Sequence, residues 1–177
     1  LVPARHGDAR GYFEETWSRA ALARHGIALD FVQDNHSVSA RAGTVRGLHF
    51  QAPPHAQAKL VRCGRGRLFD VAGDIRHGSP TFGHWYGVEL SAANGWQLLI
   101  PEGVLLGFVT REPDTEIVYK CTAPYAPETA GAVRWDDPDL AIDWGLSPAD
   151  AILSEKDAAA PPLRALRTPF RFEEIAA

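Results

Sequence analysis

The sequence of 177 residues has no methionine, two cysteines and no long apolar run. Its most hydrophobic stretch, residues 98–109, is interrupted by Pro101 and Glu102, so we do not expect it to span a bilayer. No secretory signal peptide is visible, and the missing methionine predicts that the natural N-terminus lies upstream of Leu1. These absences favour a cytoplasmic protein that does not contact a membrane.

An excess of positive charge is also lacking. The sequence has 18 Lys and Arg residues and 22 Asp and Glu residues, which gives a net charge of −4. Proteins that bind nucleic acids are usually basic, so no nucleic-acid partner is expected. Apolar residues make up 45% and charged residues 23% of the chain, an ordinary globular balance. With no linker or repeat in the sequence, residues 1–177 are predicted to form a single domain.

The two cysteines, Cys63 and Cys121, both lie in apolar runs that read as strands. We predict two buried, reduced thiols rather than a disulfide.

Short apolar runs recur between Gly, Pro, Asn and Asp turns at a spacing of about ten residues, which is typical of a β-sandwich or barrel. The predicted strands cover residues 59–63, 67–72, 85–90, 97–100, 107–110 and 116–121. Residues 64–66 and 93–95 are expected to form hairpin turns. A short helix is predicted over residues 18–26, and the tail from Ser147 has a helical composition. The predicted fold is therefore an all-β barrel with short N- and C-terminal helices, and two motif frames in the sequence indicate a cupin, or jelly-roll, barrel.

Cupin barrels bind metal through two motifs, and the frames of both occur here without their ligands. The first frame, Gly43-x5-His49-x-Gln51, has Gln where a second His belongs, and the later Glu is missing. The second frame, Gly95-x5-Pro101-x-Gly103-x2-Leu106, has Leu at its ligand position. A catalytic metal needs about three protein ligands and only one is left, so we predict no metal and no other cofactor.

His49 and Lys59 are then the polar residues that stand out. His49 follows Arg46 by three positions in a strand-like run, so both face one pocket only if Gly47 bulges the strand. A lone strand His is more often structural than a base. Lys59, one of three lysines, begins an apolar strand. It is either kept for its compact ammonium group or is part of a solvated strand edge.

Nine motifs follow one another along nearly the whole chain in an order that resembles the dTDP-4-dehydrorhamnose 3,5-epimerase family, a family of metal-free dimeric cupins. The motifs are DARGYFE at 8–14, FVQDNHS at 31–37, VRGLHFQ at 45–51, QAKLV at 57–61, FDVAGD at 69–74, GSPTFG at 78–83, IPEG at 100–103, YKCT at 119–122 and LSEKD at 153–157. No single motif is specific, but the combination is. The resemblance also implies that a short strand usual before Leu1 is absent.

The resemblance implies a nucleotide-linked 4-keto-6-deoxy sugar as substrate, in which the ketone at carbon 4 acidifies the protons on carbons 3 and 5. It assigns His49 as the base, Asp157 as the acid that orients it, and Lys59 as the ammonium that stabilises the enolate. Tyr119 matches the acid that returns a proton from the opposite face.

The resemblance also implies a set of substrate-binding residues. Positions that contact the nucleotide, the phosphates or the sugar match Arg10, Phe13, Glu15, Gln33, Asn35, Arg46, Tyr125 and Lys156. The planar guanidinium of Arg suits a diphosphate. A homodimer is expected from the same resemblance.

Two positions depart from the family pattern. Leu106 stands where the family usually has His, and Ala130 stands where it often has Glu. The loss of two polar groups predicts a changed sugar or epimerisation of one carbon only, whereas a water or a neighbouring side chain filling the gap would preserve double epimerisation. A metal-dependent cupin and a non-catalytic sugar-nucleotide-binding barrel are the other readings.

Overall fold

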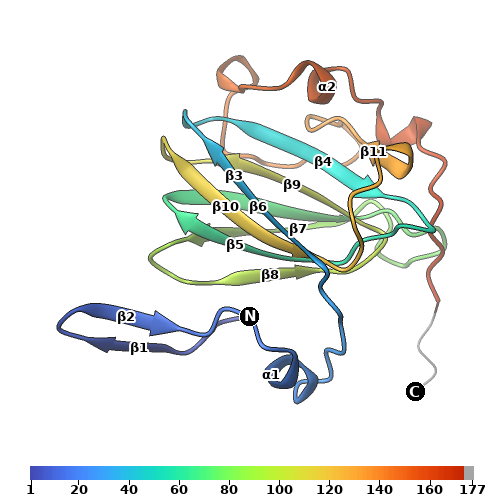
Figure 1. Cartoon of the computed structure of the whole chain (residues 1–177). Coiled ribbons are helices and arrows are strands. Elements are labelled where there is room, and N and C mark those ends of the chain that lie inside the picture. The colour runs from blue at the N-terminus through green and yellow to red at the C-terminus, as the bar shows by residue number, and fades with distance from the viewer. Residues whose placement is uncertain (174–177) are drawn as a thin grey trace.

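The computed structural model, which describes residues 1–173, is built from two antiparallel sheets that face each other (Figure 1). The first has the order β3-β10-β5-β8, formed by Gln33–Ser39, Thr115–Cys121, Lys59–Arg65 and Gln97–Ile100. The second has the order β11-β4-β9-β6-β7, formed by Ala130–Ala132, Val45–Gln51, Val104–Thr110, Arg67–Asp74 and Trp85–Ser91. This is the predicted all-β cupin-like jelly roll, and the six predicted strands are confirmed.

One hydrophobic core lies between the sheets. Its buried members come from both sheets and include Val61 and Ile117 from the first and Leu68 and Phe108 from the second. Alternating side chains of each strand point into this core, as expected for strands with one buried face. Polar residues on the inner faces are therefore placed among apolar neighbours.

A second core lies on the other side of the five-stranded sheet. Val71 and Val109 of that sheet pack against the segment that follows β11, including Val133, Trp135 and Trp144. Asp137, which is 1% exposed, accepts hydrogen bonds from backbone amides of this segment. The segment after β11 thus packs on the outer face of the five-stranded sheet.

The two predicted turns exist, but their interpretation as hairpins was wrong. Gly66 has a φ of +75° and joins β5 to β6, which belong to different sheets. The turn at residues 93–95 likewise joins β7 to β8 across the sandwich. A tight turn signal reports a reversal of the chain, but not whether the two strands pair.

Helices are few and short, as predicted. α1 covers Arg19–Ala23 with Ser18 as its N-cap, and α2 covers Glu155–Ala158 with Ser154 as its N-cap. The expectation of a helical tail was largely wrong, because apart from α2 the described tail has only single 3-10 turns at Pro148–Asp150 and Leu163–Ala165. A further 3-10 turn, Pro127–Thr129, precedes β11. Prolines open or flank these turns and limit their length.

A hairpin that the sequence did not predict extends away from the sandwich at its N-terminal side (Figure 1). It consists of β1, Arg5–Asp8, and β2, Gly11–Glu14. Arg5 ties it to the sandwich by donating hydrogen bonds to the carbonyls of Ala92 and Ala93.

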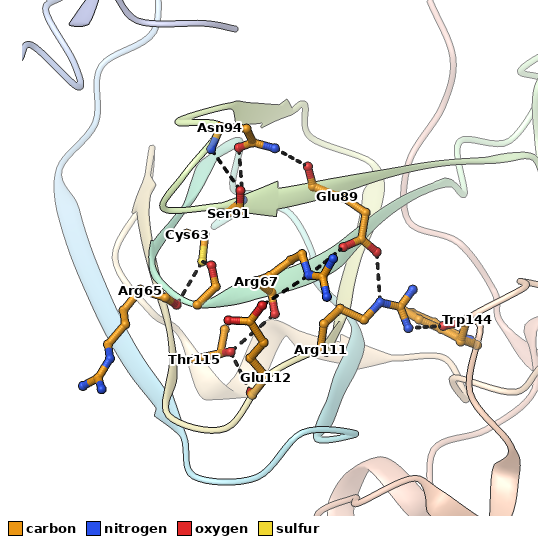
Figure 2. A network of polar contacts seen from close by, with 11 residues as sticks. Cys63, Arg65, Arg67, Glu89, Ser91, Asn94, Arg111, Glu112, Thr115 and Trp144 are labelled. Atoms are coloured by element: carbon orange, nitrogen blue, oxygen red, sulfur yellow. Dashed lines mark hydrogen bonds and ion pairs between the residues drawn. The ribbon is translucent and has the colours of Figure 1, made fainter. Parts of the chain in front are cut away.

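The loops at one end of the sandwich are held by a polar network (Figure 2). Arg111 donates to Glu89 and to the carbonyl of Trp144, and Arg67 lies 3.4 Å from Glu112. The Cys63 thiol donates to the carbonyls of Arg65 and Gly66. Cys63 and Cys121 are both buried and free. The prediction of two buried free thiols is confirmed.

Candidate active site

A cavity of about 600 Å³ opens between the sheets, and nine of the twelve predicted site residues line it. They come from the four-stranded sheet, from β4, from the loop after β10 and from α2. These residues are Gln33, Asn35, Arg46, His49, Lys59, Tyr119, Tyr125, Lys156 and Asp157. Only Arg10, Phe13 and Glu15 of the predicted set lie elsewhere.

A short polar contact in the cavity joins His49 of β4 to Asp157 of α2. His49 Nε2 lies 2.6 Å from Asp157 Oδ1, across 108 residues of sequence. The carboxylate is almost buried, at 6% side-chain exposure, while the imidazole is 39% exposed. Burial acts to raise the pKa of Asp157, but the hydrogen bond from His49 and the Ser154 hydroxyl outweigh it and leave that pKa below its usual value. An ionised carboxylate thus fixes one ring nitrogen and leaves the other for a substrate.

The strand that carries His49 is irregular. This irregularity is the condition under which the sequence predicts that Arg46 and His49 share a pocket. The pairing of β4 with β9 changes register between these two residues. Gly47 lies between them with a φ of +123°, and a Cβ there would meet Gly107 Cα at 2.6 Å. Only glycine fits this close approach of the two backbones. Both Arg46 and His49 line the cavity.

Lys59 and Tyr119 come from neighbouring strands of the opposite sheet. Lys59 begins β5 and is only 7% exposed, so it is not part of a solvated strand edge. Burial lowers the pKa of its ammonium, whereas the nearby Cys121 and Asp70 act in the other direction. Tyr119 of β10 is partly buried, and burial raises the pKa of its phenol above the ordinary value. Tyr119 therefore holds its proton at neutral pH.

Comparison with known proteins gives the family. The family model described as dTDP-4-dehydrorhamnose 3,5-epimerase matches residues 1–165. An enzyme of that name from Sinorhizobium fredii is 49% identical over 175 residues, which are 99% of this chain and 89% of the relative.

The chain belongs to the dTDP-4-dehydrorhamnose 3,5-epimerase family. It is an epimerase, in the isomerase class.

Solved structures of the epimerase family agree in fold. The dTDP-6-deoxy-D-glucose-3,5-epimerase RmlC from Legionella pneumophila, in complex with dTDP-4-keto-L-rhamnose, has a TM-score of 0.91 and 44% identity over 97% of this chain and 92% of its own. ChmJ, a 3′-monoepimerase from Streptomyces bikiniensis in complex with dTDP-quinovose, has a TM-score of 0.84 and 36% identity over 93% of this chain and 82% of its own. The similarity therefore extends to epimerases of different regiochemistry.

Other predicted binding residues of this epimerase are connected by hydrogen bonds along one wall. The Gln33 amide donates to Asn35 at 3.0 Å, and its oxygen accepts from the Tyr125 backbone amide at 2.9 Å. The exposed Lys156 stands on α2 beside Asp157. These contacts fix the side chains around an open part of the cavity.

Arg10, Phe13 and Glu15 belong to or follow the N-terminal hairpin and do not line the cavity of their own chain. Phe13 is 70% exposed, and the side chain of Arg10 is 90% exposed. Their substrate-binding role stays a prediction.

The two departures from the family pattern lie close to the base. Leu106 is the cross-strand partner of His49 on β9, and Ala130 pairs with Gln51 on the other side of β4. Both line the cavity. The wall on either side of β4 is therefore apolar at these two positions.

Two glutamines that line the cavity were not among the predicted site residues. Gln51 donates to the carbonyl of Pro124 and accepts from the Ala126 amide, and Gln57 donates to the carbonyl of Ala123. They hold the loop that carries Tyr125 against the site. Their presence in the motifs at 45–51 and 57–61 was the available signal.

Within residues 1–173, no group of three His, Cys, Asp or Glu side chains is arranged to hold a metal ion. The same residues include no helix long and apolar enough to cross a membrane.

Proposed function

We propose that this epimerase acts on a dTDP-linked 4-keto-6-deoxyhexose and inverts carbon 3, carbon 5 or both through an enolate. The observation that carries the proposal is the location of His49 and Tyr119 on opposite sheets around one cavity. Epimerisation removes a proton from one face of a carbon and returns a proton to the other face, which requires two groups on opposite sides.

In the proposed reaction, His49 takes the proton next to the ketone, and the electron pair of that C–H bond moves into the enolate. Asp157 stabilises the imidazolium that forms. The Lys59 ammonium balances the charge on the enolate oxygen. Tyr119 then gives its phenolic proton to the carbon from the opposite face, and exchange with solvent resets both groups.

The nucleotide is proposed to lie along the more open wall of the cavity. Arg46 and Lys156 are both exposed and provide positive charge for the diphosphate. Gln33, Asn35 and Tyr125 offer amide groups and an aromatic ring to the rest of the nucleotide. A catalytic role, and not binding alone, is supported by the His49–Asp157 pair, because binding alone does not need an acid–base pair.

We further propose a homodimer in the cytoplasm, in which the N-terminal hairpin of one chain reaches the cavity of its partner. The hairpin carries three predicted binding residues that lie outside their own cavity: Arg10, Phe13 and Glu15. It also exposes Tyr12 and Phe13, at 56% and 70%, which favours its burial against another chain.

Epimerisation of a single carbon is a second candidate, favoured by Leu106 and Ala130. An apolar wall beside His49 cannot bind a sugar hydroxyl or the keto oxygen on that side. A substrate with one polar group fewer, or a single productive pose, would fit this wall.

Proton NMR in D2O with dTDP-4-keto-6-deoxyglucose tests both candidates. We expect deuterium to enter at carbon 3, carbon 5 or both, and the exchanged positions identify the regiochemistry. Binding of the nucleotide sugar without any exchange would refute the enzymatic proposal.

A further inference from the structure

Asp70 of β6 is a buried acid that the proposed mechanism does not use. Its side chain is 0% exposed and shares the inner face of β6 with Leu68 and Ala72, while its partners on the adjacent strands are Val88 and Phe108. Among residues 1–173, neither carboxylate oxygen has a hydrogen-bond partner of ordinary geometry. Burial of a carboxyl group without partners is costly, so its presence in this core requires a compensating interaction.

The compensating group lies on the opposite sheet. Lys59 shares the inner face of β5 with Val61 and Cys63, which belong to the same core as the neighbours of Asp70. The charges of Lys59 and Asp70 act on each other, each favouring the ionised form of the other. Both side chains therefore point into the sandwich interior, from opposite sheets.

The other groups around this pair bring no further full charge to Asp70. Around Lys59, β10 contributes the titratable Cys121 and Tyr119, and β4 contributes His49 on the cavity. β8 and β9 contribute apolar side chains, Ile100, Leu106 and Phe108.

We propose that Asp70 is a positioning residue whose carboxylate keeps Lys59 as an ammonium ion beside the cavity. This inference rests on the proposed role of Lys59 in stabilising the enolate. Asp70 is fully buried and does not line the cavity, so it acts through Lys59 and not on the substrate.

The physical reason is the low polarity of the core. Burial lowers the pKa of Lys59 and raises the pKa of Asp70, so each group alone favours its neutral form. Together the opposite charges offset part of that penalty. Without the carboxylate, the ammonium would lose its proton at a lower pH, and the enolate would lose its counter-charge.

The first test is a lysine titration by NMR, which is practical because the chain has only the lysines Lys59, Lys120 and Lys156. With ¹³C-labelled lysine, the Lys59 signal is assigned by its loss in Lys59→Arg. We expect the Lys59 midpoint in Asp70→Asn to fall by about one pH unit or more relative to wild type. An unchanged midpoint, or a Lys59 that is already neutral at pH 7 in wild type, overturns the proposal.

The second test is the pH dependence of sugar-proton exchange. We expect the alkaline limb of kcat in Asp70→Asn to move to lower pH together with the Lys59 midpoint, with little change in KM. A shifted Lys59 midpoint with an unshifted kcat profile contradicts the positioning role. If wild type exchanges no sugar proton, the proposed function fails, while the lysine titration still decides the pairing of the two charges.

Asp137→Asn is the matched control, because Asp137 is an equally buried carboxylate that lies outside the cavity and binds backbone amides. It should lower thermal stability and leave the Lys59 midpoint and the pH profile unchanged. If Asp70→Asn does not fold, Asp70→Ser removes the same charge with a smaller side chain.

Discussion

At the scale of single residues, the pairing of His49 with Asp157 sets the chemistry of the cavity. The imidazole has one nitrogen held at 2.6 Å by a nearly buried carboxylate, and its ring remains partly open to the cavity. Such a pair orients the imidazole and stabilises the cation that forms after proton transfer.

We predict that His49→Ala abolishes deuterium uptake at every sugar carbon, with a loss of about 10²–10⁴-fold, the usual contribution of a general base. The measurement is the exchange rate by NMR, with dTDP affinity as the control for an intact cavity. Turnover near the wild-type rate would show that another group removes the proton.

Asp157→Asn is predicted to slow exchange while leaving nucleotide affinity nearly unchanged, since Asp157 contacts the imidazole. It also has a pH signature. Because the pKa of Asp157 is lowered in the folded protein, its stabilising effect is complete above its unfolded pKa and is lost as the pH falls through the folded value. Thermal unfolding from pH 7 down to pH 2 should therefore show a smaller acid-induced loss in Asp157→Asn than in wild type. Equal acid sensitivity, or a parallel loss of dTDP binding, would contradict this role.

Leu106→His is predicted to increase turnover of dTDP-4-keto-6-deoxyglucose. A buried polar group without its partner costs about 1–3 kcal/mol, or roughly one to two factors of ten in rate. Leu106→Met, which changes packing but adds no donor, is the control. Ordinary exchange at both carbons in wild type, with no gain in Leu106→His, would refute an effect of this wall on specificity.

At the scale of elements, the irregularity of β4 brings Arg46 and His49 into one cavity. From the spacing alone, the sequence made a shared pocket conditional on a bulge at Gly47, because a regular strand would have separated the two side chains. The backbone of β4 approaches β9 so closely at Gly47 that no side chain fits.

Gly47→Ala is predicted to destabilise the fold by about 1–3 kcal/mol through its backbone conformation alone, with the contact to Gly107 adding to that cost. Exchange should fall by about 10²-fold, because a small displacement of His49 misaligns the base. Chemical denaturation and NMR exchange measure the two effects. Gly78→Ala is the control: Gly78 also has a positive φ, +81°, but a Cβ there meets no atom within 4 Å. Equal effects of the two changes would contradict a special role for the β4–β9 contact.

Three elements that the sequence failed to predict, β1, β2 and β11, lack a readable pattern of apolar and polar residues. The residues of β1 and β2 are exposed almost throughout, so no alternation of apolar and polar residues marks them. β11 is only Ala130–Ala132, too short for a pattern. The central strands were predictable because one face of each lies in a core.

The site was predictable to a different degree for each residue. Chemistry and spacing alone singled out His49 and Lys59 without deciding their roles. Asp157 was assigned only through family resemblance, because nothing in the sequence indicates that α2 returns to β4. Asp70 was contained in a motif, but its burial opposite Lys59 depends on the packing of two sheets.

At the scale of the whole molecule, the hairpin formed by β1 and β2 raises the question of which cavity it serves. We predict a homodimer in light scattering at micromolar concentration, and a species of monomer mass would contradict it.

Subunit mixing gives a sharper test of the same dimer. Arg10→Ala and His49→Ala chains should each be inactive, yet after subunit exchange about a quarter of the sites should regain wild-type composition if the hairpin serves the partner's cavity. The control is a mixture of each variant with itself. No recovery despite demonstrated subunit exchange would show that each hairpin serves its own chain.

The distance of Asp157 from His49 along the chain has a consequence for biosynthesis. All strands of both sheets precede residue 133, but α2 begins only at Glu155. A nascent chain that has completed the sandwich therefore holds the imidazole without its carboxylate, and residues that cover the second core have not yet been added. Translation must therefore pass Asp157 before His49 can acquire its carboxylate partner, and a chain that terminates before Asp157 lacks this pair.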